Sequence, residues 1–422
     1  MAACKKVSVM DLKKEKIISN VDANQESLIR LSHFIHDNPE TGLKEYKAVA
    51  AIEKMLNANG IAMEKNIAGL ETAFRATVVG STPGPHVAFL AEYDALEGVG
   101  HGCGHNIIAT CATGAFLAIA KEMNDFAGQV SLIGTPAEEN FGSKCILVNE
   151  GVFDNVDFAL MMHPTSGKNL INRSARATTC LTIHYTGKSA HSSMPRSGIN
   201  ALSAAIELFN GIDRLRPTFL PSDNVNGVIL DGGKAANVVP EESTCLFSLR
   251  TNTVIEINDL MNKVCRAAKA ASLLTGAKVD ITEGNMIYER YTNLPMSEAF
   301  KHNMEMLGEK MNYADNTKFY GSSDIGNVSI HLPIIHDYLN ISQKSVNEHS
   351  VDFANDAVTP RADEICIKGA KGLALTVVDI LENPDFQKEI IEYQKTIVPK
   401  EYNDVNFQQK RTGSCDYDEE EC

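Results

Sequence analysis

The feature that most constrains the fold is a set of short apolar runs separated by helical patterns. The runs at residues 86–91, 130–135 and 157–162 have the length and composition of buried strands, and helical spacing over residues 107–123 separates the first two. Apolar strands that alternate with helices are typical of a parallel sheet covered by helices on both faces. We therefore expect an α/β fold with a mostly parallel, doubly wound main sheet.

The pattern changes near residue 173. Strand-like alternation and helical spacing then follow one another in the order β-α-β-β-α-β, which is typical of a ferredoxin-like sandwich. The expected strands are 178–185, 225–230, 243–251 and 278–282, and the expected helices are 201–215 and 256–274. We therefore expect a main domain formed by residues 1–172 and 291–400, an inserted α+β domain at 173–290, and a disordered acidic tail at 401–422.

Composition excludes several classes of partner. The chain has 422 residues, enough for two domains, and its net charge of -15 without a Lys/Arg stripe argues against binding to nucleic acid. No run approaches the roughly 18 to 20 apolar residues of a membrane span, and the first residues lack the apolar core of a secretory signal.

Scattered cysteines, several in apolar runs, indicate reduced thiols rather than a disulfide framework. We expect a cytoplasmic protein without membrane or nucleic-acid partners.

Polar clusters follow each of the three apolar runs. Asp94 and the glycine-rich segment 101–105 follow the first run, Glu138 and Glu139 follow the second, and His163 follows the third. The carboxyl ends of parallel strands meet at one edge of a sheet, so these side chains should share one crevice. Thiol, imidazole and carboxylate groups together indicate a transition-metal site.

The spacing within the glycine-rich segment supports this interpretation. Cys103 and His105 are separated by Gly104, so both side chains can point toward one ion. The alternative is a buried cysteine beside an incidental histidine, although the segment is too polar for core packing. Asp94 would orient a metal-bound histidine through a hydrogen bond.

The two adjacent glutamates can take separate roles. Because the side chains of Glu138 and Glu139 diverge, one can bind a metal while the other acts as the general base toward a water. A solvated carboxylate pair is the alternative, and the position after a strand argues against it. His163 alone is equally compatible with a hydrogen-bonded core histidine.

Eight segments also occur in the order found in a known family. The chain resembles the M20 metallopeptidases, which include aminoacylases, glutamate carboxypeptidases and plant auxin-conjugate amidohydrolases. The Cys/His loop and the segment 321–329 are most similar to the branch of the aminobenzoyl-glutamate hydrolases and the β-alanyl-lysine-type dipeptidase. The matching segments are residues 36–42, 91–96, 102–106, 136–139, 162–164, 187–191, 237–240 and 348–349.

The resemblance implies a set of ligands and a catalytic base. It implies two divalent ions, Zn²⁺ or Mn²⁺, with Glu138 as the general base toward a shared water. The implied metal ligands are Cys103, His105, Glu139, His163 and His349. Spacing alone would leave His349 as a solvated loop histidine.

The resemblance also assigns roles to the inserted domain. In this family the domain forms a homodimer and covers the site, and by analogy His191 would reach the neighbouring subunit's site and stabilise the oxyanion. Asn237 and Arg250 would grip the carboxylate of the substrate, although Arg250 is equally compatible with a surface charge.

These inferences predict a metal-dependent amidohydrolase or dipeptidase. Its substrates would be small N-acyl amino acids, dipeptides or aminobenzoyl-glutamate-like conjugates. Two other functions stay open: a hydrolase with Cys103 as nucleophile and His105 as its base, and a non-catalytic or regulatory subunit of a larger hydrolase.

Overall fold

The computed structural model describes residues 9–318 and 320–403, which form two compact units. Unit 1 contains the chain up to Ser174 together with Tyr291–Tyr320 and Asn327–Val398, and unit 2 contains Ala175–Arg290, Gly321–Gly326 and the chain from Pro399. Of the expected acidic tail, residues 404–422 lie outside the described residues, while Lys400–Asn403 form a 3₁₀ turn. In the described part of the chain, no helix is both long and apolar enough to cross a membrane.

Unit 1 is built on an eight-stranded sheet with the order β1-β2-β4-β3-β5-β14-β6-β13. The four central strands β4, β3, β5 and β14 are parallel, whereas β2 runs antiparallel to β4 and β1 antiparallel to β2. The predicted mostly parallel sheet is therefore confirmed. The strands are β1 (Glu64–Lys65), β2 (Phe74–Val79), β3 (Thr82–Ala91), β4 (Ala127–Gly134), β5 (Phe158–Thr165), β6 (Leu170–Ile171), β13 (Asn312–Tyr313) and β14 (Ile334–Asn340).

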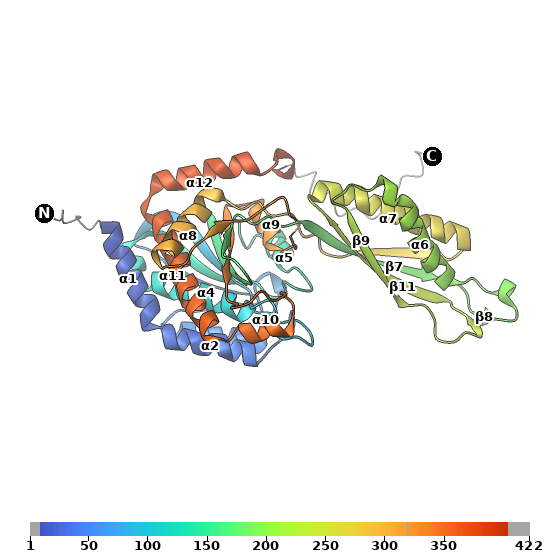
Figure 1. Cartoon of the computed structure of the whole chain (residues 1–422), viewed down its shortest axis with the longest axis horizontal. Coiled ribbons are helices and arrows are strands. Elements are labelled where there is room, and N and C mark those ends of the chain that lie inside the picture. Colours follow the sequence, from blue (N-terminus) through green and yellow to red (C-terminus); the bar gives the residue numbers. More distant parts are fainter. Residues whose placement is uncertain (1–8, 319, 404–422) are drawn as a thin grey trace. The chain divides into compact units, whose positions relative to one another are not determined.

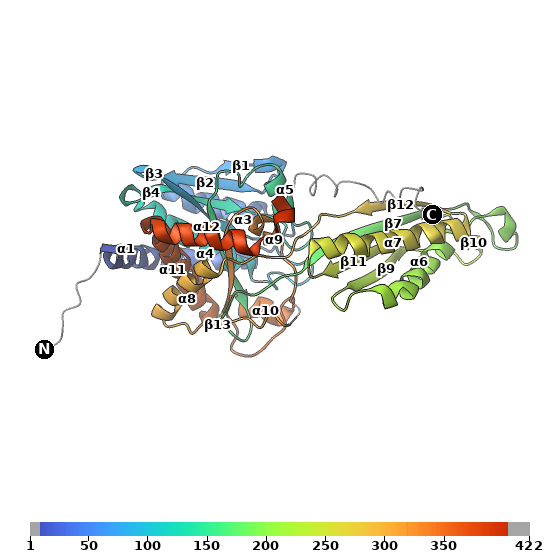
Figure 2. The same ribbon diagram turned by 90° about the horizontal axis from the view of Figure 1, so that it is seen from above.

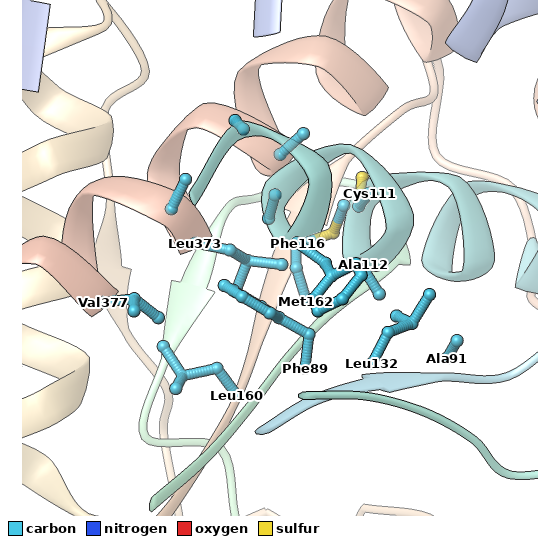
Figure 3. Packing of buried hydrophobic residues seen from close by; sticks show 14 of the residues in the cluster. Phe89, Ala91, Cys111, Ala112, Phe116, Leu132, Leu160, Met162, Leu373 and Val377 are labelled. Carbon is cyan, nitrogen blue, oxygen red and sulfur yellow. The ribbon is translucent and has the colours of Figure 1, made fainter. Parts of the chain in front are cut away.

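Helices pack against this sheet, and α4 is the central one. Residues 105–119 of α4 are buried on every side, which is the pattern of a helix enclosed between other elements. Figure 3 shows side chains of α4 and α11, among them Phe116 and Leu373, lying over Phe89, Leu132 and Leu160 of the strands. The helices of unit 1 are α1 (Val9–Ala23), α2 (Gln25–Asp37), α3 (Tyr46–Ala58), α4 (His105–Ala120), α5 (Lys144–Asn149), α8 (Leu294–Met306), α10 (Val351–Asp356), α11 (Pro360–Glu382) and α12 (Pro384–Ile397), and α9 (Ile325–Ser329) starts in the Gly321–Gly326 segment.

Unit 2 is a four-stranded antiparallel sheet with the order β12-β7-β11-β9 and two helices on one face (Figures 1 and 2). Chain order is β7-α6-β9-β11-α7-β12, so the predicted ferredoxin-like α+β fold is confirmed. Helix α7 begins with a capping box between Thr253 and Glu256 and ends at Gly276, which adopts φ 78°. The elements are β7 (Ala177–Thr186), α6 (Ala201–Leu215), β9 (Asn224–Asp231), β11 (Glu242–Thr251), α7 (Val254–Thr275), β12 (Lys278–Glu283) and a separate two-stranded ribbon of β8 (Ala190–His191) and β10 (Val238–Val239).

Some details of the sequence interpretation are corrected by the structure. The third apolar run continues as a strand to Thr165, so His163 lies inside β5 rather than beyond it. The thiols of six described cysteines are free, but Cys180 is exposed and Cys265 is in a disulfide, so the expectation of reduced thiols is wrong for Cys265. The free thiols are those of Cys103, Cys111, Cys145, Cys180, Cys245 and Cys366.

Candidate metal centre

The loop between β3 and α4 carries Cys103, and His105 is the first residue of α4. Gly104 precedes α4 with φ 75°, and a Cβ atom there would lie 2.5 Å from a side-chain carbon of Pro164, so glycine is required. This close approach brings the loop against β5. The Sγ atom of Cys103 lies 3.4 Å from Nε2 of His163.

Asp94 fixes the orientation of His105. Its Oδ1 atom lies 2.9 Å from Nδ1 of His105, and its Oδ2 atom accepts a hydrogen bond of 3.0 Å from the backbone N–H of Glu139. The Nδ1 proton therefore points to Asp94 and Nε2 is directed into the site. That Nε2 atom is buried and has no hydrogen-bond partner among the described residues.

Glu139 lies between two histidines from distant parts of the chain. Its Oε1 atom is 3.4 Å from Nε2 of His349 and 3.9 Å from Nε2 of His105. This oxygen is also buried without a hydrogen-bond donor in the part of the chain that the structure describes. Donor atoms arranged around an unpaired buried oxygen fit a cation placed between them.

The position of His349 depends on tertiary structure. Its backbone adopts φ 61°, an uncommon conformation for a residue with a side chain, and its N–H donates to the carbonyl of Gly102 at 2.8 Å. The segment before α10 is thereby attached to the glycine-rich loop. His349 enters the site although it lies 246 positions after Cys103 in the sequence.

Burial and neighbouring charges shift the pKa values of three candidate ligands. Burial, together with the charges of Glu139 and Glu138, raises the pKa of the Cys103 thiol well above its usual range, so the thiolate needs a compensating cation. Burial lowers the pKa of His163 to about 4, which leaves its imidazole neutral and able to bind a metal. Burial opposes protonation of His105, but the negative charge of Asp94 outweighs it and raises the pKa of that imidazole.

The five residues expected to bind metal and the expected base form overlapping groups in unit 1. Ligand atoms lie within 4.8 Å of one another in three such groups, namely Cys103–His105–His163, Cys103–Glu139–His349 and His105–Glu138–Glu139. Thiol, imidazole and carboxylate donors in this arrangement fit a transition metal. The donor set and its unpaired buried atoms therefore form a candidate metal site at the carboxyl ends of β3, β4 and β5.

The other three expected site residues belong to unit 2. His191 is exposed in β8, and its Nδ1 atom accepts a hydrogen bond from the N–H of Ser193 at 3.1 Å. The carbonyl of Asn237, the residue before β10, accepts from the N–H of Ser192 at 3.0 Å, and His191 pairs with Val238 of β10. Arg250 lies in β11 and donates to Oγ of Ser322 at 3.0 Å.

Sequence reasoning missed three buried residues beside this site. Glu45 accepts a hydrogen bond of 2.8 Å from the backbone N–H of Ala137, next to Glu138, and Lys144 pairs with Glu92. The position of Glu92 two residues before Asp94 was a usable signal, since alternate residues of an extended segment face the same side. Glu45 and Lys144 carry no comparable signal, because charged side chains are usually exposed to solvent.

Known proteins with similar sequences are peptidases and hydrolases. A family model described as a peptidase dimerisation domain matches residues 174–273. The Xaa-Arg dipeptidase of Mus musculus is 33% identical over 391 residues, covering 89% of this chain and 90% of that protein. One subunit of the p-aminobenzoyl-glutamate hydrolase of Escherichia coli strain K12 is 28% identical over 281 residues, covering 62% and 58% of the two chains.

Solved structures share the fold. A dinuclear metal binding peptidase of the M20 family from Bacillus subtilis superposes with a TM-score of 0.64 at 19% identity, covering 86% of this chain and 99% of that one. An aminobenzoyl-glutamate utilization protein from Klebsiella pneumoniae gives a TM-score of 0.69 at 16% identity, covering 84% and 96%.

Fold, site and relatives together define the class of this protein. It is a metal-dependent hydrolase that acts on amide or peptide C–N bonds. The chain belongs to the M20 family of metallopeptidases.

Proposed function

We propose that this hydrolase uses two divalent ions, Zn²⁺ or Mn²⁺, to cleave small N-acyl amino acids, dipeptides or aminobenzoyl-glutamate-like conjugates. The observation that carries the proposal is the overlap of the three ligand groups through Cys103, His105 and Glu139. Residues shared between neighbouring groups are what a pair of ions with common ligands requires. The dipeptidase and conjugate-hydrolase relatives support this class of substrate.

Each proposed residue has a stated chemical task. Bound ions would supply Lewis-acid polarisation of the scissile carbonyl and make a water proton easier to remove. Glu138 accepts that proton at its carboxylate as the water attacks, and then delivers it to the leaving amine. Asp94 keeps the imidazole of His105 in the tautomer that leaves Nε2 free.

The thiol of Cys103 argues against a cysteine nucleophile. A nucleophilic cysteine needs a lowered pKa, whereas burial raises the pKa of this thiol well above its usual range. A non-catalytic subunit is the other alternative, and the complete set of ligands and base argues against it. Assay of the purified chain alone tests that alternative.

We also propose a homodimer formed through unit 2, in which His191 stabilises the oxyanion in the partner's site and Asn237 and Arg250 grip the substrate carboxylate. The match of residues 174–273 to a dimerisation domain supports the dimer. Strand β9 lies at the edge of its sheet with Val228 and Leu230 exposed at 54% and 60%, which suits pairing with a second copy.

Complementation tests the shared site. Neither Glu138→Gln nor His191→Ala homodimers should turn over substrate at a normal rate, but mixing the two variants should restore activity, because some heterodimers then contain one intact site. The absence of recovery after demonstrated subunit exchange would contradict the role of His191 across the dimer.

A substrate panel tests the proposed reaction. N-acyl glutamates, aminobenzoyl-glutamate and basic dipeptides should be assayed with Zn²⁺ or Mn²⁺ after removal of metal by a chelator. We expect hydrolysis of at least one of these classes, its loss on chelation and its return with one of the two ions. Hydrolysis that survives complete metal removal would contradict the proposal.

The proposed cytoplasmic location rests on the free thiols. Six of the seven described cysteines are free, Cys265 being the exception, and Cys103 has to stay reduced in order to bind metal. Cell fractionation with an antibody to the chain tests this location.

A further inference from the structure

A fully buried ion pair lies directly behind the candidate metal centre. Lys144, the first residue of α5, has no solvent exposure, and its Nζ atom lies 2.6 Å from Oε1 of Glu92, which is equally buried. A lysine is almost never fully buried unless it is paired, because removing the charge from water is costly. Apolar residues of similar volume are often at least as stable as such a pair, so stability alone does not explain it.

The second oxygen of Glu92 faces the candidate metal centre. Its Oε2 atom lies 3.4 Å from Nε2 of His105, and both atoms are buried without hydrogen-bond partners among the residues described. Asp94 holds the Nδ1 side of the ring, so the Nε2 lone pair and the Glu92 carboxylate face each other. Two electron-rich atoms in this arrangement repel each other unless a proton or a metal cation lies between them, and a bound metal ion would take the place of the proton.

The distance between these two atoms matches ligation of one ion. Nitrogen and oxygen ligands bind Zn²⁺ at 2.0–2.2 Å, so two ligands at a tetrahedral angle lie about 3.4 Å apart. The pair formed by Oε1 of Glu139 and Nε2 of His349 has the same separation of 3.4 Å. A carboxylate oxygen of Glu92 also lies within 4.8 Å of one of Glu138, so it borders the proposed base.

We propose that Glu92 is a further ligand of the ion held by His105, and that Lys144 is the positioning residue that aims it. This inference rests on the metal centre of the proposed function. Lys144 occupies Oε1, so that only Oε2 is directed at the ion. Since Lys144 follows the loop that carries Glu138 and Glu139, the pair also ties that loop to the end of β3.

A double substitution separates ligation from a purely structural role. Glu92→Gln alone leaves the buried Lys144 charge unpaired, whereas Glu92→Gln with Lys144→Met removes both charges and keeps the side-chain volumes similar. A matched control removes another largely buried pair, Lys14 and Asp379, whose Nζ and Oδ1 atoms lie 2.6 Å apart between α1 and α11. The control substitutions are Lys14→Met with Asp379→Asn.

Metal binding is the readout, measured on folded protein of each variant by elemental analysis after dialysis and by titration against a competing chelator. We expect two ions in the unsubstituted protein and in the control. In the double variant, one of the two affinities should fall by about 100-fold or more, which is the upper end of the loss seen for removal of residues that orient ligands. The visible spectrum of the Co²⁺-loaded protein should change, because a ligand is lost.

A double variant with both affinities and the Co²⁺ spectrum unchanged would overturn the inference and leave the proposed function standing. An unsubstituted protein that binds no ion would overturn the metal centre itself. If the double variant does not fold, Glu92→Asp is the alternative test. It keeps the negative charge beside Lys144, but its shorter side chain moves the second carboxylate oxygen away from the ion. It should also weaken one affinity, and normal affinities in this variant would overturn the inference.

Discussion

Replacement of Asp94 by Asn should weaken metal binding, because one buried carboxylate orients two ligands. Oδ1 accepts from Nδ1 of His105 at 2.9 Å, and Oδ2 accepts from the N–H of Glu139 at 3.0 Å. Burial raises the pKa of Asp94, but the positive charge of His105 outweighs burial and holds the pKa below its usual value, so the carboxylate is ionised. An asparagine offers one oxygen and one NH₂ group. The NH₂ group cannot accept a hydrogen bond from an N–H group, so one of these two contacts is lost.

The expected magnitude follows from the loss of these contacts. A hydrogen bond to a charged group contributes about 1.5–3 kcal/mol, and loss of a residue that orients a metal ligand typically lowers affinity about 10- to 100-fold. We therefore expect Asp94→Asn to bind metal about 10- to 100-fold more weakly, as measured by titration against a chelating dye, with helix content by circular dichroism unchanged.

A control distinguishes this effect from the loss of any carboxylate–imidazole pair. Asp363 Oδ1 lies 2.8 Å from Nε2 of His33, where the side chains are 23% and 38% exposed. Asp363→Asn should leave metal affinity unchanged. Unaltered affinity in Asp94→Asn, or an equal loss in both variants, would refute the reasoning.

Three further predictions follow from the same geometry. Glu138→Gln should retain its metal and lose about 10²- to 10⁴-fold in kcat, measured by initial rates and elemental analysis, and normal turnover would refute the assignment of the base. Burial raises the pKa of Glu45 from 4.5 to about 7, so the folded protein holds a proton that the unfolded chain has already released, and stability should fall by up to about 3 kcal/mol as pH rises from about 4.5 to 7. Glu45→Gln mimics the protonated carboxyl and should flatten this dependence in urea unfolding at pH 5 and pH 8, whereas an unchanged slope would contradict the shift. Removal of metal should lower the midpoint of thermal unfolding, because ions that bind only the folded chain stabilise it. Calorimetry with and without chelator measures this midpoint, and an unchanged midpoint would contradict the prediction.

The sequence predicts the central fold well because burial on both faces leaves a clear pattern. The three apolar runs became β3, β4 and β5, and the insertion was recognised from its alternating strands. Strands β2 and β14 were missed, as was the start of α11 at Pro360. Thr359 caps that helix and Pro360 occupies its first turn, so a local signal for its start was present.

The candidate site was predictable only in part. Residues that follow a strand, such as Asp94 and Glu139, could be expected at the edge of the sheet from topology alone. His349 could not, since its place depends on a positive φ and on a backbone contact with Gly102. The Lys144–Glu92 pair was hidden for a different reason, because no periodic pattern marks a charged residue that tertiary packing buries.

Anomalous diffraction from crystals grown with Zn²⁺, recorded above and below the zinc absorption edge, locates the proposed ions. We expect two anomalous peaks in each subunit, both within bonding distance of the cluster formed by Cys103, His105, Glu139, His163 and His349. Peaks located only away from these side chains, or no peak in Zn²⁺-loaded crystals, would contradict this expectation.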